Sequence, residues 1–535
     1  MPTIKPKCPH CSAITIVKSE EDLRPIGLQL IVYKLECGHS ITEATVEVPV
    51  TNVNVIDESY NGYGGFRAFP YQIEGIEFIE RSNFNALCAD EMGLGKTPTG
   101  LLTYKRNKKN LTPTIVICKS SLHINWTREY CRWVLEIDPT DSEQVKSVNP
   151  FDLPFIHPSG EMGLPPGFNF YLVSMDMLAK KPVAESIKKM GVKLLIVDEC
   201  HNFKDTSSKR TIALMEIAQT IPHKIMLSGT PLMNKTLEYF PILNIIKPHH
   251  FPTKKSFAGK FLDWDWQSKK WLGFTKYGKQ QFFNLTKDYI IRRESKEVQK
   301  DLPEIFIQKH YAAEFDKSLA KQYNKLADEL ENAINDRRTR TANAVEILGI
   351  MSNMRHLTGL MKVTAILEHV REFLESTDEK ITIGIHHVLV RNMLMAGLAE
   401  YNPIEISGAD NGASKDIKLQ EFKKPENRVL IANILAGGEG LNIQFCNNFV
   451  IAERQWNPAK EDQFVKRFHR HGQKLTVFGH FIIAADTIDD FFEQLLSFKK
   501  NVTTDSVDAD FSSDRDFMVE LARKVVSTRL RVVGM

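Results

Sequence analysis

The sequence lacks the long apolar segments that mark membrane and secreted proteins. No apolar run in its 535 residues approaches the roughly 20 residues that a membrane-spanning helix needs. The start of the chain, residues 1–10, has no apolar segment of the kind found in secretory signals. We therefore expect an intracellular protein with no membrane partner, in the cytoplasm of a bacterium or in a nucleoid or nucleus.

Cysteine and net charge are also scarce. The chain has 8 cysteines, and its formal net charge is +3. Isolated cysteines in mostly apolar surroundings are typical of free buried thiols in a reducing compartment; they are Cys88, Cys118, Cys131, Cys200 and Cys446. The small positive charge permits nucleic-acid binding but does not argue for it, because a basic groove can lie on a nearly neutral protein.

Two series of short apolar runs, each bounded by polar or turn residues, dominate the rest of the chain. Helical patterns lie between the runs, and this alternation predicts parallel sheets covered on both faces. The predicted strands are 114–118, 170–174, 193–197 and 224–227 in the first series, and 381–386, 428–432, 448–452 and 477–483 in the second. The sequence thus predicts an α/β fold with two tandem parallel-sheet lobes.

Residues 314–375 are charged, periodic and free of proline, which predicts a helical region between the lobes. The predicted division is an N-terminal module at 1–50, a first lobe at 60–305, a helical linking region at 306–375, a second lobe at 376–500 and a tail at 501–535.

A Gly-rich turn follows the apolar residues 86–89 and precedes a helical pattern. It reads Asp90, Glu91, Met92, Gly93, Leu94, Gly95, Lys96, Thr97. Glycines let backbone N–H groups approach phosphates, lysine can reach the β- and γ-phosphates, and the threonine hydroxyl can ligate Mg²⁺. The pattern favours a phosphate-binding loop over an ordinary turn, although Asp90 occupies the place where the usual pattern has glycine. The nucleotide expected there is ATP.

A second candidate element is a buried strand that ends in two carboxylates, Asp198 and Glu199, with His201 close behind. The carboxyl ends of parallel strands form the ligand crevice of such sheets. There Asp198 would hold Mg²⁺ and Glu199 would polarise the attacking water.

These two elements resemble motifs of superfamily 2 helicases, and their wording resembles the SWI/SNF-type branch of DNA translocases. Further segments match that branch in order: 67–75, 227–234, 291–303, 436–442, 456–458 and 463–473. The compact second lobe is most similar to annealing-helicase-like members and to short phage or bacterial members. The resemblance implies RecA-like lobes, with ATP and Mg²⁺ as cofactors and DNA, duplex or branched, as partner.

The family motifs also imply roles for individual residues. Gln72 would read adenine, and Arg467 and Arg470 would reach the γ-phosphate from the other lobe. The residues expected to couple the nucleotide to DNA are His201, Ser228, Thr230, Gly440 and Gln463, and those expected to contact DNA are Lys119, Ser120, Ser174, Gly437 and Trp456. An interlobe packing role for Trp456 is the alternative.

The N-terminal module carries the remaining cysteines. Cys8 and Cys11 on one expected turn, with Cys37 and His39 on another, suit tetrahedral Zn²⁺ in a zinc-ribbon-like module. His10 in place of His39, or free surface cysteines, are the alternatives. The module would bind DNA or a protein partner.

The sequence therefore predicts an ATP hydrolase that acts on DNA as a translocase or remodeller. Two alternatives stay open: a helicase that separates DNA or RNA strands, and a nucleotide-regulated nucleic-acid-binding scaffold without turnover.

Overall fold

The chain divides into two compact units, Met1–Glu58 and Ser59–Met535. The computed structural model describes residues 57–158, 160, 162–229, 236–266, 269–335, 342–438, 441–455, 458–492, 522–526 and 530, and the backbone of three strands before them. Those strands, β1 (Val17–Asp22), β2 (Leu30–Leu35) and β3 (Ser40–Ala44), form an antiparallel sheet in the order β1-β2-β3. The predicted zinc ligands Cys8, Cys11, Cys37 and His39 lie outside the described residues.

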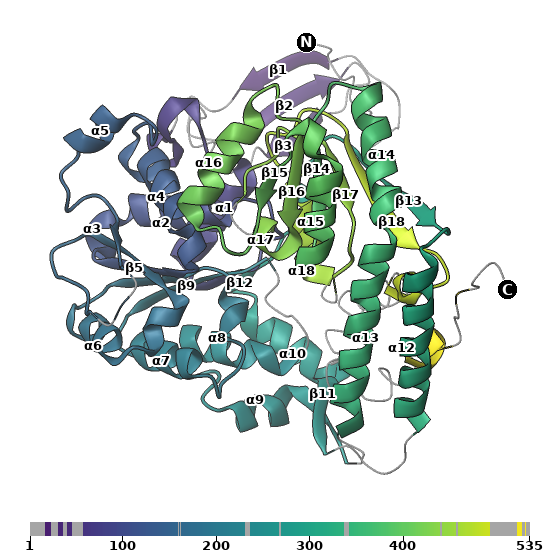
Figure 1. Ribbon diagram of the computed structural model, residues 1–535. Coiled ribbons are helices and arrows are strands. Elements are labelled where there is room, and N and C mark those ends of the chain that lie inside the picture. Colours follow the sequence, from purple (N-terminus) through teal and green to yellow (C-terminus); the bar gives the residue numbers. More distant parts are fainter. Residues whose placement is uncertain are drawn as a thin grey trace. The chain divides into compact units, whose positions relative to one another are not determined.

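The second unit is built on two sheets whose strands are all parallel (Figure 1). In sheet order, the first contains β12 (Ile290–Ile291), β4 (Asn85–Cys88), β9 (His223–Leu227), β8 (Leu194–Val197), β5 (Thr114–Cys118), β7 (Phe170–Ser174) and β6 (Phe155–Ile156). The second contains β13 (Ile305–Ala312), β18 (Val477–Ala484), β17 (Asn448–Ile451), β14 (Ile381–Ile385), β16 (Val429–Asn433) and β15 (Ile404–Ile406). The predicted fold of two parallel-sheet α/β lobes is confirmed.

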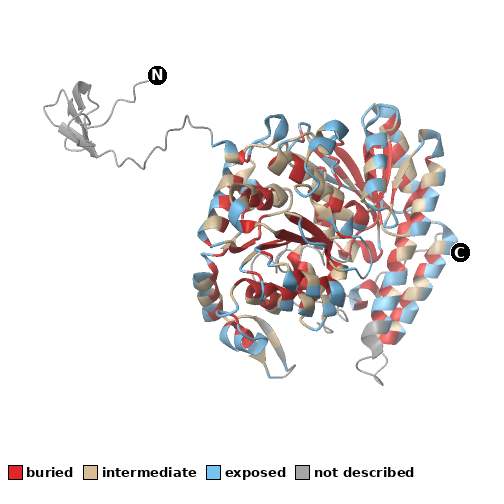
Figure 2. Cartoon of the chain, turned by 90° about the vertical axis from the view of Figure 1, so that its left-hand side faces the viewer, coloured by how far each residue is buried: buried red, intermediate tan, exposed pale blue. Residues whose placement is uncertain are grey.

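Both faces of each sheet are buried. On β8, Leu195 and Val197 belong to one apolar cluster while Leu194 and Ile196 belong to another. Since alternate residues of a strand point to opposite faces, the two clusters cover opposite sides of the sheet. The second sheet repeats this arrangement, with one apolar cluster on each face, which explains why its central strands read as continuous apolar runs. The buried strands are red in Figure 2.

Helices between the strands provide the cover. Those of the first lobe are α1 (Pro70–Arg81), α2 (Lys96–Arg106), α3 (Lys108–Leu111), α4 (His123–Tyr130), α5 (Ser142–Ser147), α6 (Lys181–Lys189), α7 (Lys209–Ala218), α8 (Tyr239–Ile246), α9 (Lys254–Phe261), α10 (Lys276–Thr286) and α11 (Ser295–Val298), with a β10 (Leu262–Asp265) and β11 (Lys270–Phe274) hairpin. Those of the second are α14 (Val363–Ser376), α15 (Val388–Gly397), α16 (Gly412–Lys423), α17 (Ile434–Gly437) and α18 (Pro458–Val465).

The predicted linking region, 306–375, includes parts of the second lobe at both ends. Residues 305–312 precede the helical pattern expected at 314–375 and form β13, which pairs along its whole length with β18 of the second sheet. At the other end, α14 packs its apolar side into the core of the second lobe. Two long helices remain between them, α12 (Lys317–Asn335) and α13 (Ala342–Met361), and they lie side by side (Figure 1).

Part of the predicted tail packs against these helices. Ala522, Val525 and Leu530 join the apolar cluster of α12 and α13, and the backbone of Leu530 exchanges hydrogen bonds with the Asn324 side chain. Among the described residues, no helix is both long and apolar enough to cross a membrane.

Candidate active site

The Gly-rich turn lies between β4 and α2, as the sequence predicts. Gly95 precedes α2 with a φ of +72°, a left-handed conformation that favours glycine. A Cβ atom there would lie 2.2 Å from the amide nitrogen of Gln72, so the close approach also requires glycine. Lys96 begins α2, and its Nζ donates to the carbonyl oxygens of Asp90 and Glu91 at 2.8 and 3.2 Å. Thr97 follows in the first turn of the helix.

Gln72 fixes this turn from α1. Its Oε1 accepts from the backbone of Phe69 at 2.9 Å, while its Nε2 donates to the carbonyls of Leu94 at 3.1 Å and Gly95 at 3.4 Å. The amide thus holds the loop in shape, and its expected contact with adenine stays a prediction.

Arg293, from the segment after β12, explains the aspartate at position 90. Its Nε donates to Asp90 Oδ1 at 3.0 Å, its Nη2 donates to Oδ2, and its backbone N–H donates to Oδ1 at 3.1 Å. Both side chains are buried. The start of the Gly-rich turn, residues 90–97 and from here on called the phosphate loop after its predicted role, is therefore anchored to the end of the first lobe. Sequence reasoning noted the segment but gave Arg293 no role.

The acidic pair follows β8, beside the loop. Asp198 Oδ2 accepts from the indole Nε1 of Trp126 at 3.0 Å, and its Oδ1 accepts from the backbone of Glu199 at 2.9 Å. Glu199 has a φ of +46°, an uncommon conformation for a residue with a side chain. His201 Nδ1 lies 3.2 Å from Glu199 Oε2 and 3.0 Å from Ser228 Oγ. His201 thus links the acidic end of β8 to Ser228 at the end of β9. Both His201 and Ser228 are among the residues predicted to couple the nucleotide to DNA.

The two carboxylates have shifted pKa values of opposite sign. Burial, with the charge of Glu199 beside it, raises the pKa of Asp198 to about 6. Burial also acts to raise the pKa of Glu199, but the hydrogen bond and charge of His201 and the charge of Lys96 outweigh it and lower the value to about 2. Both carboxylates are therefore mostly ionised at neutral pH, but Asp198 takes up a proton in mild acid, where Glu199 stays ionised.

The second lobe contributes α18 and the segment after it to the same place. Gln463 Nε2 donates to Glu199 Oε1 at 3.3 Å, and Lys466 Nζ lies 3.1 Å from Glu91 Oε1. A Cβ atom on Gly93 would lie 3.6 Å from the Cβ of Arg470. The phosphate loop, the acidic strand end and the Arg470 segment therefore meet across one interface between the lobes.

Arg470 and Arg467 differ in what they contact. Arg470 Nη1 donates to Asn442 Oδ1 at 2.9 Å, while its buried Nε has no hydrogen-bond partner among the described residues. Burial lowers the pKa of Arg470, although the guanidinium stays charged. Arg467 instead donates from Nε and Nη2 to the carbonyl of Gly438, at 3.0 and 2.5 Å. Arg470 thus has an unsatisfied donor and lies beside the Gly-rich turn.

The residues predicted to contact DNA lie in both lobes. Lys119 and Ser120 follow β5, Ser174 ends β7, and Gly437 ends α17. Gly437 is buried against Phe464, where a Cβ atom would approach the ring to 2.8 Å. Trp456, Thr230 and Gly440 lie outside the described residues. The contacts of these residues with DNA stay predictions.

Comparison with known families matches most of the chain. Residues 71–371 match the family described as the SNF2-related domain, and residues 362–472 match the helicase conserved C-terminal domain. The first match alone covers more than half of the chain.

Several curated proteins are similar. The human protein "DNA annealing helicase and endonuclease ZRANB3" is 27% identical over 453 residues, which are 82% of this chain and 40% of that protein. The Xenopus tropicalis protein "SWI/SNF-related matrix-associated actin-dependent regulator of chromatin subfamily A-like protein 1" is 26% identical over 481 residues, 85% of this chain and 46% of that protein. The chain thus spans less than half the length of these relatives.

Among solved structures, "Sulfolobus solfataricus SWI2/SNF2 ATPase core in complex with dsDNA" is 24% identical, with a TM-score of 0.39. The similarity covers 88% of this chain and 99% of that chain.

Proposed function

The chain belongs to the SNF2-related domain family, and from that membership we propose that it is an ATP-driven translocase that moves along duplex DNA. The observation that carries the proposal is the position of Arg470. It reaches from the second lobe to the phosphate loop of the first, with a buried donor that nothing in the described chain satisfies. Hydrolysis would therefore require both lobes and would follow their closure.

When a nucleotide binds, its phosphates would replace hydrogen bonds that side chains of the loop now make within the protein. Lys96 would exchange the carbonyls of Asp90 and Glu91 for phosphate oxygens. Thr97 and Asp198 would hold Mg²⁺, and the positive charge of the ion would lower the raised pKa of Asp198 and keep it ionised.

Glu199 would polarise the attacking water, a role that its low pKa supports, because the carboxylate is ionised at neutral pH. Arg470 would donate to the charge that develops on the γ-phosphate. In comparable phosphoryl-transfer enzymes, such an arginine contributes about 10³–10⁵ in rate. Gln463 of the second lobe donates a hydrogen bond to Glu199 of the first. The environment of the proposed catalytic base would therefore change when the lobes open or close.

Movement along DNA would use contacts with the phosphate backbone, which do not depend on sequence. The predicted contacts Lys119, Ser120 and Ser174 lie at the carboxyl ends of strands in the first sheet, and Gly437 lies just after β16 in the second. A change in lobe spacing would therefore change the distance between two sets of DNA contacts. The names of the relatives, a DNA annealing helicase and a SWI/SNF-related regulator of chromatin, support DNA as the partner.

The test is steady-state ATP hydrolysis by the full chain with duplex, forked or single-stranded DNA, with RNA, and without nucleic acid. We expect duplex or forked DNA to stimulate the rate and the protein to displace the third strand of a DNA triplex. If no nucleic acid stimulates hydrolysis, the proposal fails. Strand separation without triplex displacement would instead favour a strand-separating helicase. A zero rate with saturating DNA and ATP would favour a nucleotide-regulated scaffold.

A further inference from the structure

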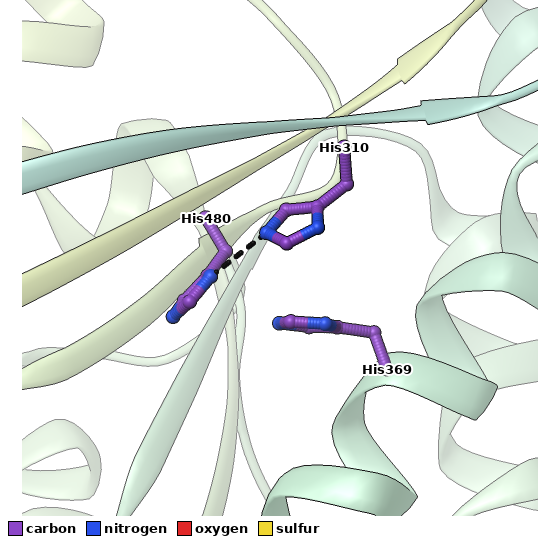
Figure 3. Close-up of side chains that lie close together, drawn as sticks. All are labelled: His310, His369 and His480. Carbon is purple, nitrogen blue, oxygen red and sulfur yellow. Dashed lines mark hydrogen bonds between the residues drawn. The ribbon is translucent and has the colours of Figure 1, made fainter.

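Three histidines of the second lobe converge outside the ATPase site. His310 lies on β13, His480 on β18 and His369 on α14, and their side chains surround one small space (Figure 3). One ring nitrogen from each lies within 4.8 Å of those of the other two. The nearest pair is His310 Nε2 and His480 Nδ1, at 3.0 Å.

The pairing of the strands brings these residues together. β13 and β18 run parallel with His310 directly opposite His480, so both side chains leave the same face of the sheet. The ring of His369 lies 4.5 Å from that of His310 and 4.6 Å from that of His480, measured between centroids. Three elements thus each direct one imidazole into a half-buried space, where simple packing would favour apolar side chains.

Burial and the neighbouring imidazoles disfavour the protonated form of two of the three histidines, His369 and His480. Burial and the other two histidines lower the pKa of His480 to about 4. Burial and His310 also lower the pKa of His369, and Glu372 partly opposes this effect. A neutral imidazole carries one N–H and one lone pair, and the lone pair is the group that binds a metal ion.

The hydrogen bonding of the cluster is incomplete. His310 and His480 share one hydrogen bond, whereas His369 Nε2 is buried and has no hydrogen-bond partner among the described residues. A buried polar nitrogen without a partner is costly, and a bound cation would remove that cost.

We propose that His310, His369 and His480 bind a transition-metal ion of the Zn²⁺ class, which cross-links β13, β18 and α14. Imidazole ligands suit Zn²⁺, Co²⁺, Ni²⁺ and Cu²⁺, whereas Mg²⁺ and Ca²⁺ require oxygen ligands. The site is therefore distinct in chemistry from the Mg²⁺ site expected at Asp198.

The geometry needs only a small adjustment. Tetrahedral Zn²⁺ with bonds of about 2.0–2.1 Å separates its ligand nitrogens by about 3.3 Å. The His310–His480 pair is already near this separation, and His369 reaches it by a side-chain movement on the order of 1–2 Å. The fourth position would hold water or a carboxylate, and the exposed Glu372 provides negative charge nearby.

The consequence would be mechanical. β13 is the edge strand by which the chain enters the second lobe, and α14 is the helix by which it returns from α12 and α13. A metal ion at the cluster would fix both ends of this excursion to the sheet. The helices α12 and α13, which lie between β13 and α14 in the chain, would then unfold together with the second lobe and not before it.

The test is Co²⁺ binding by the full-length protein after removal of bound metal. We expect the wild-type chain to bind one more equivalent of Co²⁺ than His369→Gln. That equivalent should show visible absorption of nitrogen-bound Co²⁺ without the near-ultraviolet charge-transfer band of thiolate, and Zn²⁺ should displace it. Exposed His249, replaced by Gln, is the matched control and should change nothing.

Two further variants distinguish this site from the predicted N-terminal zinc site and from a folding defect. Cys8→Ser with Cys11→Ser removes two of the predicted N-terminal ligands and should leave the imidazole-bound Co²⁺ in place. His310→Gln, on the edge strand, provides a second ligand loss if His369→Gln does not fold, with circular dichroism to check folding. In addition, Zn²⁺ should raise the melting temperature of the wild type but not of either histidine variant.

Equal Co²⁺ stoichiometry and spectra in the wild type and both histidine variants would overturn the proposal. Loss of all bound Co²⁺ after the two cysteine substitutions would overturn it as well. Neither result depends on ATP hydrolysis, so the proposed function and the metal site stand or fail separately.

Discussion

Asp198 and Glu199 are neighbours in the chain, yet their surroundings shift their pKa values in opposite directions. Glu199 has His201 and Lys96 nearby to stabilise its carboxylate, whereas Asp198 is buried with the charge of Glu199 beside it. In the proposed Mg²⁺ site, a carboxylate that is costly to ionise gains most from binding of the cation. Mg²⁺ binding is thus expected to offset the free energy that burial of this charge costs.

Asp198→Asn should stabilise the nucleotide-free protein while abolishing hydrolysis. A carboxyl whose folded pKa is raised from 3.8 to about 6 destabilises the folded state above that pH. The penalty disappears as the pH falls toward the pKa of this aspartate in the unfolded chain, because the folded and the unfolded state then both hold the proton. We expect a gain of about 1–3 kcal/mol in the free energy of unfolding at pH 8, shrinking steadily below pH 6. Denaturant unfolding across this range measures it, and a gap that widens with acidity would contradict the interpretation.

Glu199→Gln should separate nucleotide binding from hydrolysis. The variant retains a polar side chain of the same size but cannot accept a proton from water, so kcat should fall by about 10²–10⁴. Binding of ATP should stay within a few-fold of the wild type in a fluorescence titration. Glu216→Gln, at an exposed ion pair with Lys188 in the same lobe, is the control and should hydrolyse ATP normally. Comparable loss of ATP binding and kcat would contradict a role in water activation.

At the scale of elements, the phosphate loop depends on a strand that is distant in sequence. β12 pairs with β4, and the chain just after it supplies Arg293 to Asp90. The backbone of Ser295 also donates to Glu91 Oε2 at 2.6 Å. Two residues of the loop are therefore held by the segment through which the chain leaves the first lobe.

Arg293→Ala should destabilise the first lobe and weaken nucleotide binding together. Removing one partner of a buried ion pair leaves Asp90 charged and uncompensated, at a cost of about 3–5 kcal/mol. Arg292→Ala next to it removes an exposed guanidinium and is the matched control. Thermal unfolding and ATP titration measure both effects. Equal melting temperatures for the two variants would show that the pair does not anchor the loop.

The eight strands predicted from the sequence could be found because they are mostly apolar runs in sheets that are buried on both faces. The first strand of the second lobe, β13, could not be predicted in this way. β13 has exposed or half-exposed residues at nearly every position, since it is an edge strand, and so it lacks an apolar run. Its pairing with β18 depends on a partner that follows it by most of the second lobe.

The candidate site divides in the same way. The positions of Asp198 and Glu199 could be predicted because they directly follow a buried strand, and that of Lys96 because a Gly-rich turn precedes it. The position of Arg470 could be predicted because the motif around it resembles a family motif. The anchor formed by Arg293 and the cluster of His310, His369 and His480 join residues far apart in sequence. Only pairing and packing bring such residues together, and no local pattern marks them.

At the scale of the whole second unit, ion pairs and hydrogen bonds join the two lobes at several points. Besides the contacts of Gln463 and Lys466, Arg128 on α4 donates through both terminal nitrogens to Asp416 on α16, with Nη2 and Oδ2 2.7 Å apart. A pocket lined by residues of both helices adjoins this pair. The pair lies apart from the phosphate loop in sequence and is suited to favour the closed arrangement without taking part in hydrolysis.

Arg128→Asp should therefore shift the lobes away from closure. The pair is partly exposed, so its contribution is about 1 kcal/mol, or roughly a five-fold change in the closed population. We expect lower kcat at saturating ATP and a larger distance between fluorophores placed on the two lobes. The charge-swapped double variant, Arg128→Asp with Asp416→Arg, should restore both readings in large part. Arg391→Glu breaks a comparable pair, with Glu405, inside the second lobe and should leave the distance unchanged. If Arg128→Asp and Arg391→Glu behave alike, the pair contributes to stability and not to closure.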